Sequence, residues 1–404
     1  MTRDAVENVL QVNVRLSEGG AAGVARTLAD GLRSVGVRSP FAYGYSHRGR
    51  SSPLEGAYDG VRITPAPVAA LNRLSFYLNG EETSVHGSRE WDAFKNAVRQ
   101  ADVVHLHAVH SHIARVRDLV DLLIQNEKPT VWTMHDQWLF TGRCAQPGLC
   151  RLWETGCPKC PDMAAYPPGL IDKARVHWPT RRELLDRLRD AVPFALVSCA
   201  EWLADEADAA GLGPVRTVTN SVDQEFWAAR ALGATSVAAV GAQTLRCLFL
   251  CRDLRDKQKI DWTVLHMLAA TPGVGLTVMG NHAPPSAGTL KITPAVSRRE
   301  ELAETMGSHD ALIFLSTVDY FPLTVAEALT SGLTVFAIDS LAAREFSAES
   351  GLRLFGSSEE LLDAVRAAAA DHDVSPVQRT RATRFEPSKM VDAYRVVYEE
   401  LLRG

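Results

Sequence analysis

The chain has 404 residues, of which 46% are hydrophobic and 23% are charged, and its formal net charge is −5. This length exceeds one ordinary domain and predicts two domains of about 200 residues each. The negative charge argues against a nucleic-acid binder that works by bulk positive charge, and no apolar run approaches the roughly 18 residues of a membrane helix. The chain does not begin with a basic segment followed by an apolar one, so we expect a cytoplasmic protein without an export signal.

A strand followed closely by glycines begins the first half. Residues 9–14 are predicted to form a strand, and Gly19 and Gly20 precede apolar residues at helical spacing. Glycines let a ligand approach the backbone closely, and a helix N-terminus attracts anions. This corner fits a phosphate or a sugar, although a tight turn without a ligand explains the same residues equally well.

Histidines gather around the next two predicted strands, at residues 102–107 and 130–134. His105 and His107 alternate onto one face of the first strand. No carboxylate or cysteine lies among these histidines, so we interpret them as cleft-lining or hydrogen-bonded side chains rather than metal ligands. His135 follows the second strand directly, at the end where ligands bind in open parallel sheets. The alternative is a buried structural histidine.

Four cysteines follow within 17 positions: Cys144, Cys150, Cys157 and Cys160. As thiolates they can hold one tetrahedral zinc ion, although the first spacing is longer than in a standard zinc knuckle. Unligated cysteines or a redox pair are the alternatives. Four sulfurs leave zinc no open coordination position, so a zinc ion here would be structural and not catalytic.

The second half begins after a predicted linker at residues 223–235, with a strand at residues 245–251. Arg252 and Lys257 come directly after this strand. Both cations can reach one diphosphate, the arginine as a planar fork and the lysine as a point charge. Arg255 and Lys259 are rival candidates for the second cation, and a solvated charge run is the alternative to all of them.

The stretch from residue 311 to residue 338 reads as a buried strand, a polar loop, a helix and a second apolar strand. Two apolar runs joined through a helix mark a βαβ unit and a parallel sheet. The loop contains Asp319, and Glu327 lies on the helix eight positions later. The first N–H groups of that helix, at Leu323 and Thr324, suit a phosphate or a sugar hydroxyl. A carboxylate on an apolar helix face suits a ribose diol, although a plain βαβ corner with surface acids is the alternative.

These segments resemble the retaining glycosyltransferases of glycosyltransferase family 4, which have the GT-B fold. The stretch just described is similar to the family's acid-x7-acid motif, although the family's first acid is usually glutamate and here it is Asp319. The matching positions in this motif are Phe321, Pro322, Glu327, Ala328, Leu329 and Gly332. Arg252 and Lys257 match an Arg-x4-Lys pair, and the loop after His135 and the segment at residues 220–223 match two further motifs. The resemblance covers nearly the whole chain in scattered motifs.

The resemblance implies an α/β fold of two Rossmann-like domains whose parallel sheets face each other across a cleft. The expected acceptor-binding domain covers residues 1–225 and contains the cysteine-rich loop at residues 144–160. The expected nucleotide-sugar-binding domain covers residues 235–385. The last helix, at residues 386–404, is expected to cross back to the first domain.

The resemblance also implies a hexosyltransferase that moves a sugar from a nucleotide-diphosphate sugar to a hydroxyl acceptor with retention of the anomeric configuration. We expect a UDP-sugar as donor and a role in polysaccharide, glycolipid or secondary-metabolite biosynthesis. The implied catalytic residues are His135, Arg252, Lys257 and Asp319. The implied donor-binding residues are Gly19, Gly20, Phe321, Pro322, Leu323, Thr324 and Glu327.

Catalysis is expected to need no metal, because fixed cations are available and no Asp-x-Asp motif follows a buried strand. The Asp-His-Asp sequence at residues 371–373 follows an alanine run and is interpreted as a solvated helix end. We expect no nucleic-acid partner and at most peripheral membrane contact. The alternatives are a non-catalytic nucleotide-sugar-binding protein, a GT-B enzyme that makes a non-glycosidic bond, and a zinc-stabilised interaction module.

Overall fold

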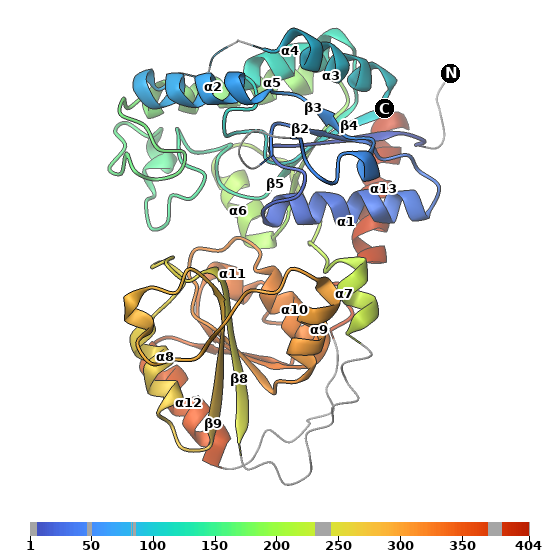
Figure 1. The fold of residues 1–404 in the computed structure, drawn as a ribbon. Helices are drawn as coiled ribbons and strands as arrows, with labels where there is room; N and C mark the ends of the chain where they lie inside the picture. Colours follow the sequence, from blue (N-terminus) through green and yellow to red (C-terminus); the bar gives the residue numbers. More distant parts are fainter. Residues whose placement is uncertain are drawn as a thin grey trace. The chain divides into compact units, whose positions relative to one another are not determined.

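The computed structural model describes residues 6–46, 51–81, 83, 86–230, 244–370 and 382–403. The chain divides into two compact units: the first contains Met1–Thr219 and Ser388–Gly404, and the second contains Asn220–Pro387. Each unit has its own sheet with helices packed around it (Figure 1). All pairs of neighbouring strands are parallel, so the predicted fold class of two parallel α/β units is confirmed.

The sheet of the first unit has the strand order β3-β2-β1-β4-β5-β6-β7. Its strands are β1 (Val9–Asn13), β2 (Phe41–Tyr43), β3 (Val61–Arg62), β4 (Val103–Leu106), β5 (Thr130–Met134), β6 (Phe194–Ser198) and β7 (Val215–Thr217). Its helices are α1 (Gly20–Ser34), α2 (Ala66–Asn79), α3 (Ser88–Gln100), α4 (Val116–Gln125), α5 (Ala174–Ala191), α6 (Glu201–Ala209) and α13 (Pro387–Arg403). Every residue of β1, β4 and β5 is buried, as expected for a parallel sheet covered on both faces. The strand order reverses between β1 and β4, which places the loops after these strands at a topological switch point.

The sheet of the second unit has the strand order β10-β9-β8-β11-β12-β13. Its strands are β8 (Leu245–Asp253), β9 (Val274–Asn281), β10 (Ile292–Thr293), β11 (Ala311–Phe314), β12 (Thr334–Ile338) and β13 (Leu352–Phe355). Its helices are α7 (Gln224–Ala229), α8 (Trp262–Ala269), α9 (Arg299–Gly307), α10 (Leu323–Ser331), α11 (Leu341–Arg344) and α12 (Ser358–Ala370). The switch point lies between β8 and β11, so Arg252 and Asp319 lie at or beyond the carboxyl ends of adjacent strands.

Short 3₁₀ turns supplement the helices at Gly56–Tyr58, Leu152–Thr155 and Pro285–Ala287. In the described part of the chain, no helix combines the length and the apolar character needed to cross a membrane.

The segment predicted as a linker is partly helical. Residues 224–229 form α7, because the Asp223 carboxylate caps its N-terminus and accepts the N–H of Phe226 at 2.8 Å. Residues 220–225, which the sequence analysis placed in the first domain, group with the second unit. Residues 231–235 and the Asp-His-Asp sequence at 371–373 lie outside the described residues.

The last helix belongs to the first unit. Two tyrosines of α13, Tyr394 and Tyr398, are fully buried, and their hydroxyl groups bond to Thr133 at 2.9 Å and to His105 Nδ1 at 2.7 Å. A Cβ added at Gly31 of α1 would collide with Val391, so α1 and α13 approach each other closely. The helix therefore packs against the same strands that carry the histidines.

Candidate functional site

An ion pair joins the two loops at the switch point of the second unit. Lys259 Nζ lies 2.5 Å from Asp319 Oδ1, and both side chains are partly exposed. Lys259 follows β8, and Asp319 follows the adjacent strand β11. The structure therefore brings one of the rival lysines, Lys259, to the loop acid, where it can meet an anionic ligand.

The other predicted cations lie in different surroundings. Arg252 and Lys257 are exposed, and neither forms an ion pair with any residue that the structure describes. Arg255 pairs with Asp253 at 2.6 Å, and this pair is solvent-exposed. Arg252 remains available for a ligand, and the assignment of Lys257 stays a prediction.

Glu327 lies in a charged triad that spacing alone did not reveal. It is 4% exposed on α10, and its carboxylate accepts a bond from Arg299, the first residue of α9, which also donates to Asp223. Burial raises the pKa of Glu327, and the positive charge of Arg299 opposes this rise. Arg299 thus holds the buried carboxylate in place and offsets its charge.

The N-terminus of α10 contains the other predicted donor-binding residues. Pro322 is the N-cap, no side chain caps the helix, and the partly exposed Leu323 and Thr324 begin its first turn. Such unpaired N–H groups favour an anionic or hydroxyl ligand. Phe321 has a different position: its ring packs against Phe346 at 5.0 Å and against Phe385 at 6.0 Å, and so it anchors the loop in the core.

In the first unit, the backbone at Gly19 and Gly20 has open space beside it. Gly19 is the N-cap of α1 and has a φ of 92°, which favours glycine because other residues rarely adopt it. A Cβ added at Gly19 or at Gly20 would meet no atom within 4 Å. A ligand therefore has room to approach the backbone at the start of α1.

His135 is hydrogen-bonded within a buried group of histidines. Its Nε2 lies 3.0 Å from His107 Nδ1, and His107 Nε2 lies 2.8 Å from Gln11 Oε1. Burial lowers the pKa of His135 to about 4 and lowers that of His107 well below its usual value. Both rings are therefore neutral at pH 7. His105 has partners on both ring nitrogens, Tyr398 and Thr133, so His105 and His107 are hydrogen-bonded side chains, as interpreted from the sequence.

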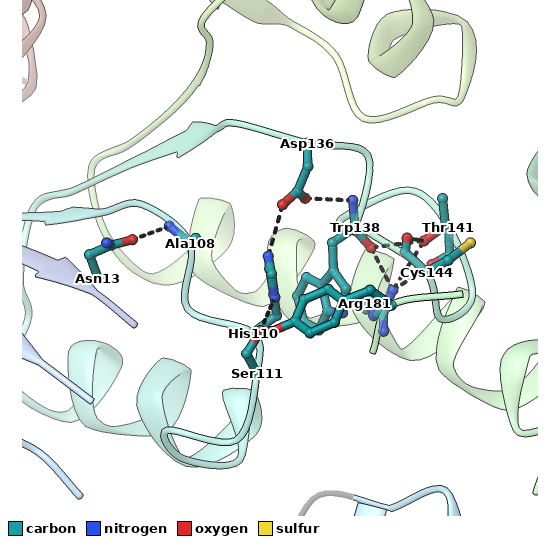
Figure 2. A network of polar contacts seen from close by, with 10 residues as sticks. Asn13, Ala108, His110, Ser111, Asp136, Trp138, Thr141, Cys144 and Arg181 are labelled. Carbon is teal, nitrogen blue, oxygen red and sulfur yellow. Dashed lines mark hydrogen bonds and ion pairs between the residues drawn. The ribbon is translucent and has the colours of Figure 1, made fainter. Parts of the chain in front are cut away.

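Figure 2 shows a second network in the loops after β4 and β5. Asp136 accepts bonds from His110 Nε2 at 2.8 Å and from the N–H of Trp138 at 2.9 Å, and His110 Nδ1 lies 2.5 Å from Ser111 Oγ. The order Ser-His-Asp resembles that of a nucleophile triad. However, Ser111 is 3% exposed and its oxygen also bonds to the Tyr166 hydroxyl at 2.5 Å, so this network orders the loops.

Arg181 holds the loop that leads to the cysteines. Its guanidinium donates to the carbonyl oxygens of Trp138 and Thr141, and its Cζ lies 3.7 Å from the centre of the Trp138 ring (Figure 2). The Thr141 hydroxyl donates to the carbonyl oxygen of Cys144 at 2.6 Å. The first cysteine is thus fixed to the network that also contains Asp136.

All four cysteines of this loop are free thiols. Burial raises the pKa of Cys144 to about 11 and also raises the pKa values of Cys157 and Cys160. The N–H of Gly142 donates to Cys157 Sγ at 3.2 Å. Among the described residues, which include this whole loop, no three His, Cys, Asp or Glu side chains are arranged to hold a metal ion. The raised pKa values of Cys144, Cys157 and Cys160 make these three thiols poorly suited to act as nucleophiles.

No family model matches the chain. Over 370 residues, however, it is 34% identical to a protein of Escherichia coli strain K12 named "Putative colanic acid biosynthesis glycosyl transferase WcaC", and the match covers 89% of each chain. Among solved structures, a glycosyltransferase from Rickettsia africae has a TM-score of 0.62 at 11% identity, with 99% of each chain covered. Anabaena Alr3699/HepE, solved in complex with UDP and glucose, has a TM-score of 0.53 at 12% identity, with 98% of this chain and 97% of that chain covered.

Two parallel α/β units with polar loops at their switch points define the GT-B class, and the solved structures show the same fold. The identity to the Escherichia coli protein shows the family: the chain belongs to the glycosyltransferases with the GT-B fold. The family resemblance inferred from the sequence motifs is thereby confirmed at this level.

Proposed function

We propose that this enzyme transfers a hexose from a UDP-sugar to a hydroxyl group of a polysaccharide or glycolipid intermediate. The polymer class is suggested by the name of the Escherichia coli relative, and the donor by the solved complex of Alr3699/HepE with UDP and glucose. The observation that carries the proposal is the contact between Lys259 and Asp319 at the switch point of the second unit. There a cation and an acid lie beside an uncapped helix N-terminus.

The main chemical task is to stabilise the negative charge that develops on the leaving diphosphate. Lys259 is assigned to this charge, because Asp319 holds its ammonium group at the strand ends. Lys257, in contrast, forms no ion pair with any residue that the structure describes. Arg252 and the N–H groups at the start of α10 complete the anion site. Lys259 and the backbone N–H groups are held in place before the donor arrives, so they need little reorganisation during the reaction.

The nucleoside and the sugar are assigned to separate groups. Glu327, held by Arg299, accepts hydrogen bonds from the ribose hydroxyls. As the family resemblance implies, Asp319 of the second unit is assigned to positioning the donor sugar, and His135 of the first unit is assigned to a sugar hydroxyl. No protein nucleophile is assigned, so retention of the anomeric configuration is proposed to occur by attack on the face from which the diphosphate leaves.

The proposed reaction is tested by incubating the protein with UDP-sugars and candidate acceptors in the presence of EDTA. We expect transfer or slow donor hydrolysis without a divalent ion, and a product whose anomeric proton coupling matches that of the donor. Activity that EDTA abolishes and that magnesium or manganese restores would contradict the metal-free mechanism. An inverted product would contradict retention, and binding without any turnover would favour the non-catalytic alternative.

The cysteine loop is proposed to stabilise the fold and not to take part in the reaction. Cys157 is buried and accepts the Gly142 N–H, so Cys157→Ser should lower the melting temperature by several degrees while kcat changes little. Metal analysis of the purified protein is the companion measurement: about one zinc per chain would assign structural zinc to the four thiolates. An unchanged melting temperature together with an absence of zinc would contradict a structural role.

A further inference from the structure

A row of buried polar side chains crosses four neighbouring strands and ends at His135. Ser39 precedes β2, Gln11 lies in β1, His107 follows β4, and His135 follows β5. The sheet order is β2-β1-β4-β5, so the row runs across the sheet one strand at a time. Ser39, Gln11 and His107 are at most 1% exposed, which leaves water little access to their hydrogen bonds.

The first bonds of this row have a fixed direction. Ser39 Oγ lies 3.2 Å from the carbonyl oxygen of Val9, which can only accept, so the Ser39 hydroxyl donates its single proton there. Ser39 must then accept from Gln11, whose Nε2 lies 3.2 Å away. The opposite orientation of the Gln11 amide would require two protons from Ser39. Gln11 therefore turns its oxygen, Oε1, toward His107 at 2.8 Å.

The same logic fixes the protons of both histidines. His107 is neutral and has one ring proton, which must lie on Nε2 because Gln11 Oε1 can only accept. His107 Nδ1 therefore has no proton and presents its lone pair as an acceptor. Since His135 Nε2 lies 3.0 Å from that lone pair, His135 must carry its own proton on Nε2. His135 is neutral as well, so its Nδ1 has no proton.

We propose that Ser39, Gln11 and His107 fix His135 as the Nε2–H tautomer, so that His135 Nδ1 accepts a hydrogen bond from a sugar hydroxyl. His107 is then a positioning residue that acts through His135. Only the identity of the hydroxyl as part of the sugar rests on the proposed function. A fixed acceptor selects for a hydroxyl at this point and against a carboxylate, because two acceptors would face each other.

The tautomer can be observed without any substrate. Two-bond ¹⁵N–¹H correlation spectra of the full-length protein with ¹⁵N-labelled histidine distinguish the protonated ring nitrogen from the bare one, and the spectra of His107→Asn and His135→Asn assign the signals. We expect both His107 and His135 to be protonated on Nε2. A proton on Nδ1 of either ring, or a mixture of tautomers at His135, would overturn the proposal even if the enzyme is active.

A matched pair of variants tests the positioning role. His107→Asn keeps an acceptor near the position of Nδ1, whereas His107→Leu has a similar shape without an acceptor. Both remove the bond to Gln11 and should lower the melting temperature by similar amounts. His107→Asn should keep His135 as the Nε2–H tautomer, whereas His107→Leu should give mixed tautomers and lose about three- to tenfold more kcat/KM, the effect of about one hydrogen bond between neutral groups.

The two proposals fail in different ways. Equal kcat/KM for the Asn and Leu variants, with the His135 tautomer fixed in one and mixed in the other, would overturn the positioning role of His107. If the wild-type protein transfers no sugar from any nucleotide donor, the proposed function fails. The spectra of the wild-type protein would still decide whether the row of side chains sets the tautomer.

Discussion

Lys259→Ala should lower kcat by about a hundred- to a thousandfold, the size of effect seen when one fixed group that stabilises developing charge is removed. The ammonium of Lys259 lies 2.5 Å from Asp319 at the switch point, where the diphosphate is proposed to leave. Negative charge on the diphosphate grows toward the transition state, so kcat should fall more than the donor KM rises. Steady-state kinetics with the preferred UDP-sugar measures both values.

Lys257→Ala is the matched comparison, because it removes the same charge two positions away in the same loop. We expect its loss in kcat to be at least tenfold smaller than that of Lys259→Ala. Equal losses in kcat, or a larger loss for Lys257→Ala, would indicate that Lys257 contacts the diphosphate. Either result would contradict the assignment of Lys259 that rests on its ion pair with Asp319.

Arg299→Met should lower the free energy of unfolding by up to about 3 kcal/mol at neutral pH, less than for a fully buried ion pair because the Arg299 side chain is 32% exposed. The substitution leaves the Glu327 carboxylate, which is 4% exposed, without the cation that offsets its charge. Urea denaturation of the wild-type protein and the variant at several pH values measures the difference.

The pH dependence of this loss has a definite sign. Burial already raises the pKa of Glu327, and removing Arg299 should raise it further. A carboxyl group whose pKa is raised in the folded state favours folding below its ordinary pKa, and this contribution is lost as the pH rises through the folded-state value. The deficit of Arg299→Met should therefore be small in acid and should grow toward neutral pH.

The double variant Arg299→Met/Glu327→Gln is the control for this prediction. Without the Glu327 carboxylate, the only acid of the triad that still lacks the Arg299 charge is Asp223, whose side chain is 26% exposed, so much of the lost stability should return at neutral pH. A double variant as unstable as Arg299→Met, or a deficit that does not depend on pH, would show that the arginine contributes through packing rather than charge.

Much of the fold could be predicted from the sequence, because its strands are nearly continuous apolar runs separated by helical patterns. The runs at residues 130–134 and 311–314 are strands with every residue buried. Helix α7 was missed because its six residues are too short for a clear periodicity, and its N-terminus depends on the Asp223 cap.

The site could be predicted only in part. Asp319 and Glu327 stand out because a carboxylate directly after a buried strand or on an apolar helix face needs a partner. Sequence spacing did not distinguish Lys257 from Lys259, since both lie in a charged loop and only the fold shows which one meets Asp319.

Arg299 was missed because it lies 28 residues before Glu327 and shares no motif with it. The row from Ser39 to His135 depends on the order of four strands, which no local pattern contains. Each of these contacts joins segments that are distant in the sequence, and so each required the fold.

The central claim is that the second unit binds a nucleotide-diphosphate sugar through Glu327 and the neighbouring strand ends. Calorimetric titration of UDP and a panel of UDP-sugars into the full-length protein, in the presence of EDTA, tests this claim most directly. We predict saturable binding at one site, with affinity that Glu327→Gln weakens by about ten- to a hundredfold through the loss of a charge-assisted hydrogen bond. No binding of any of these ligands, or an affinity that is unchanged in Glu327→Gln, would contradict the account.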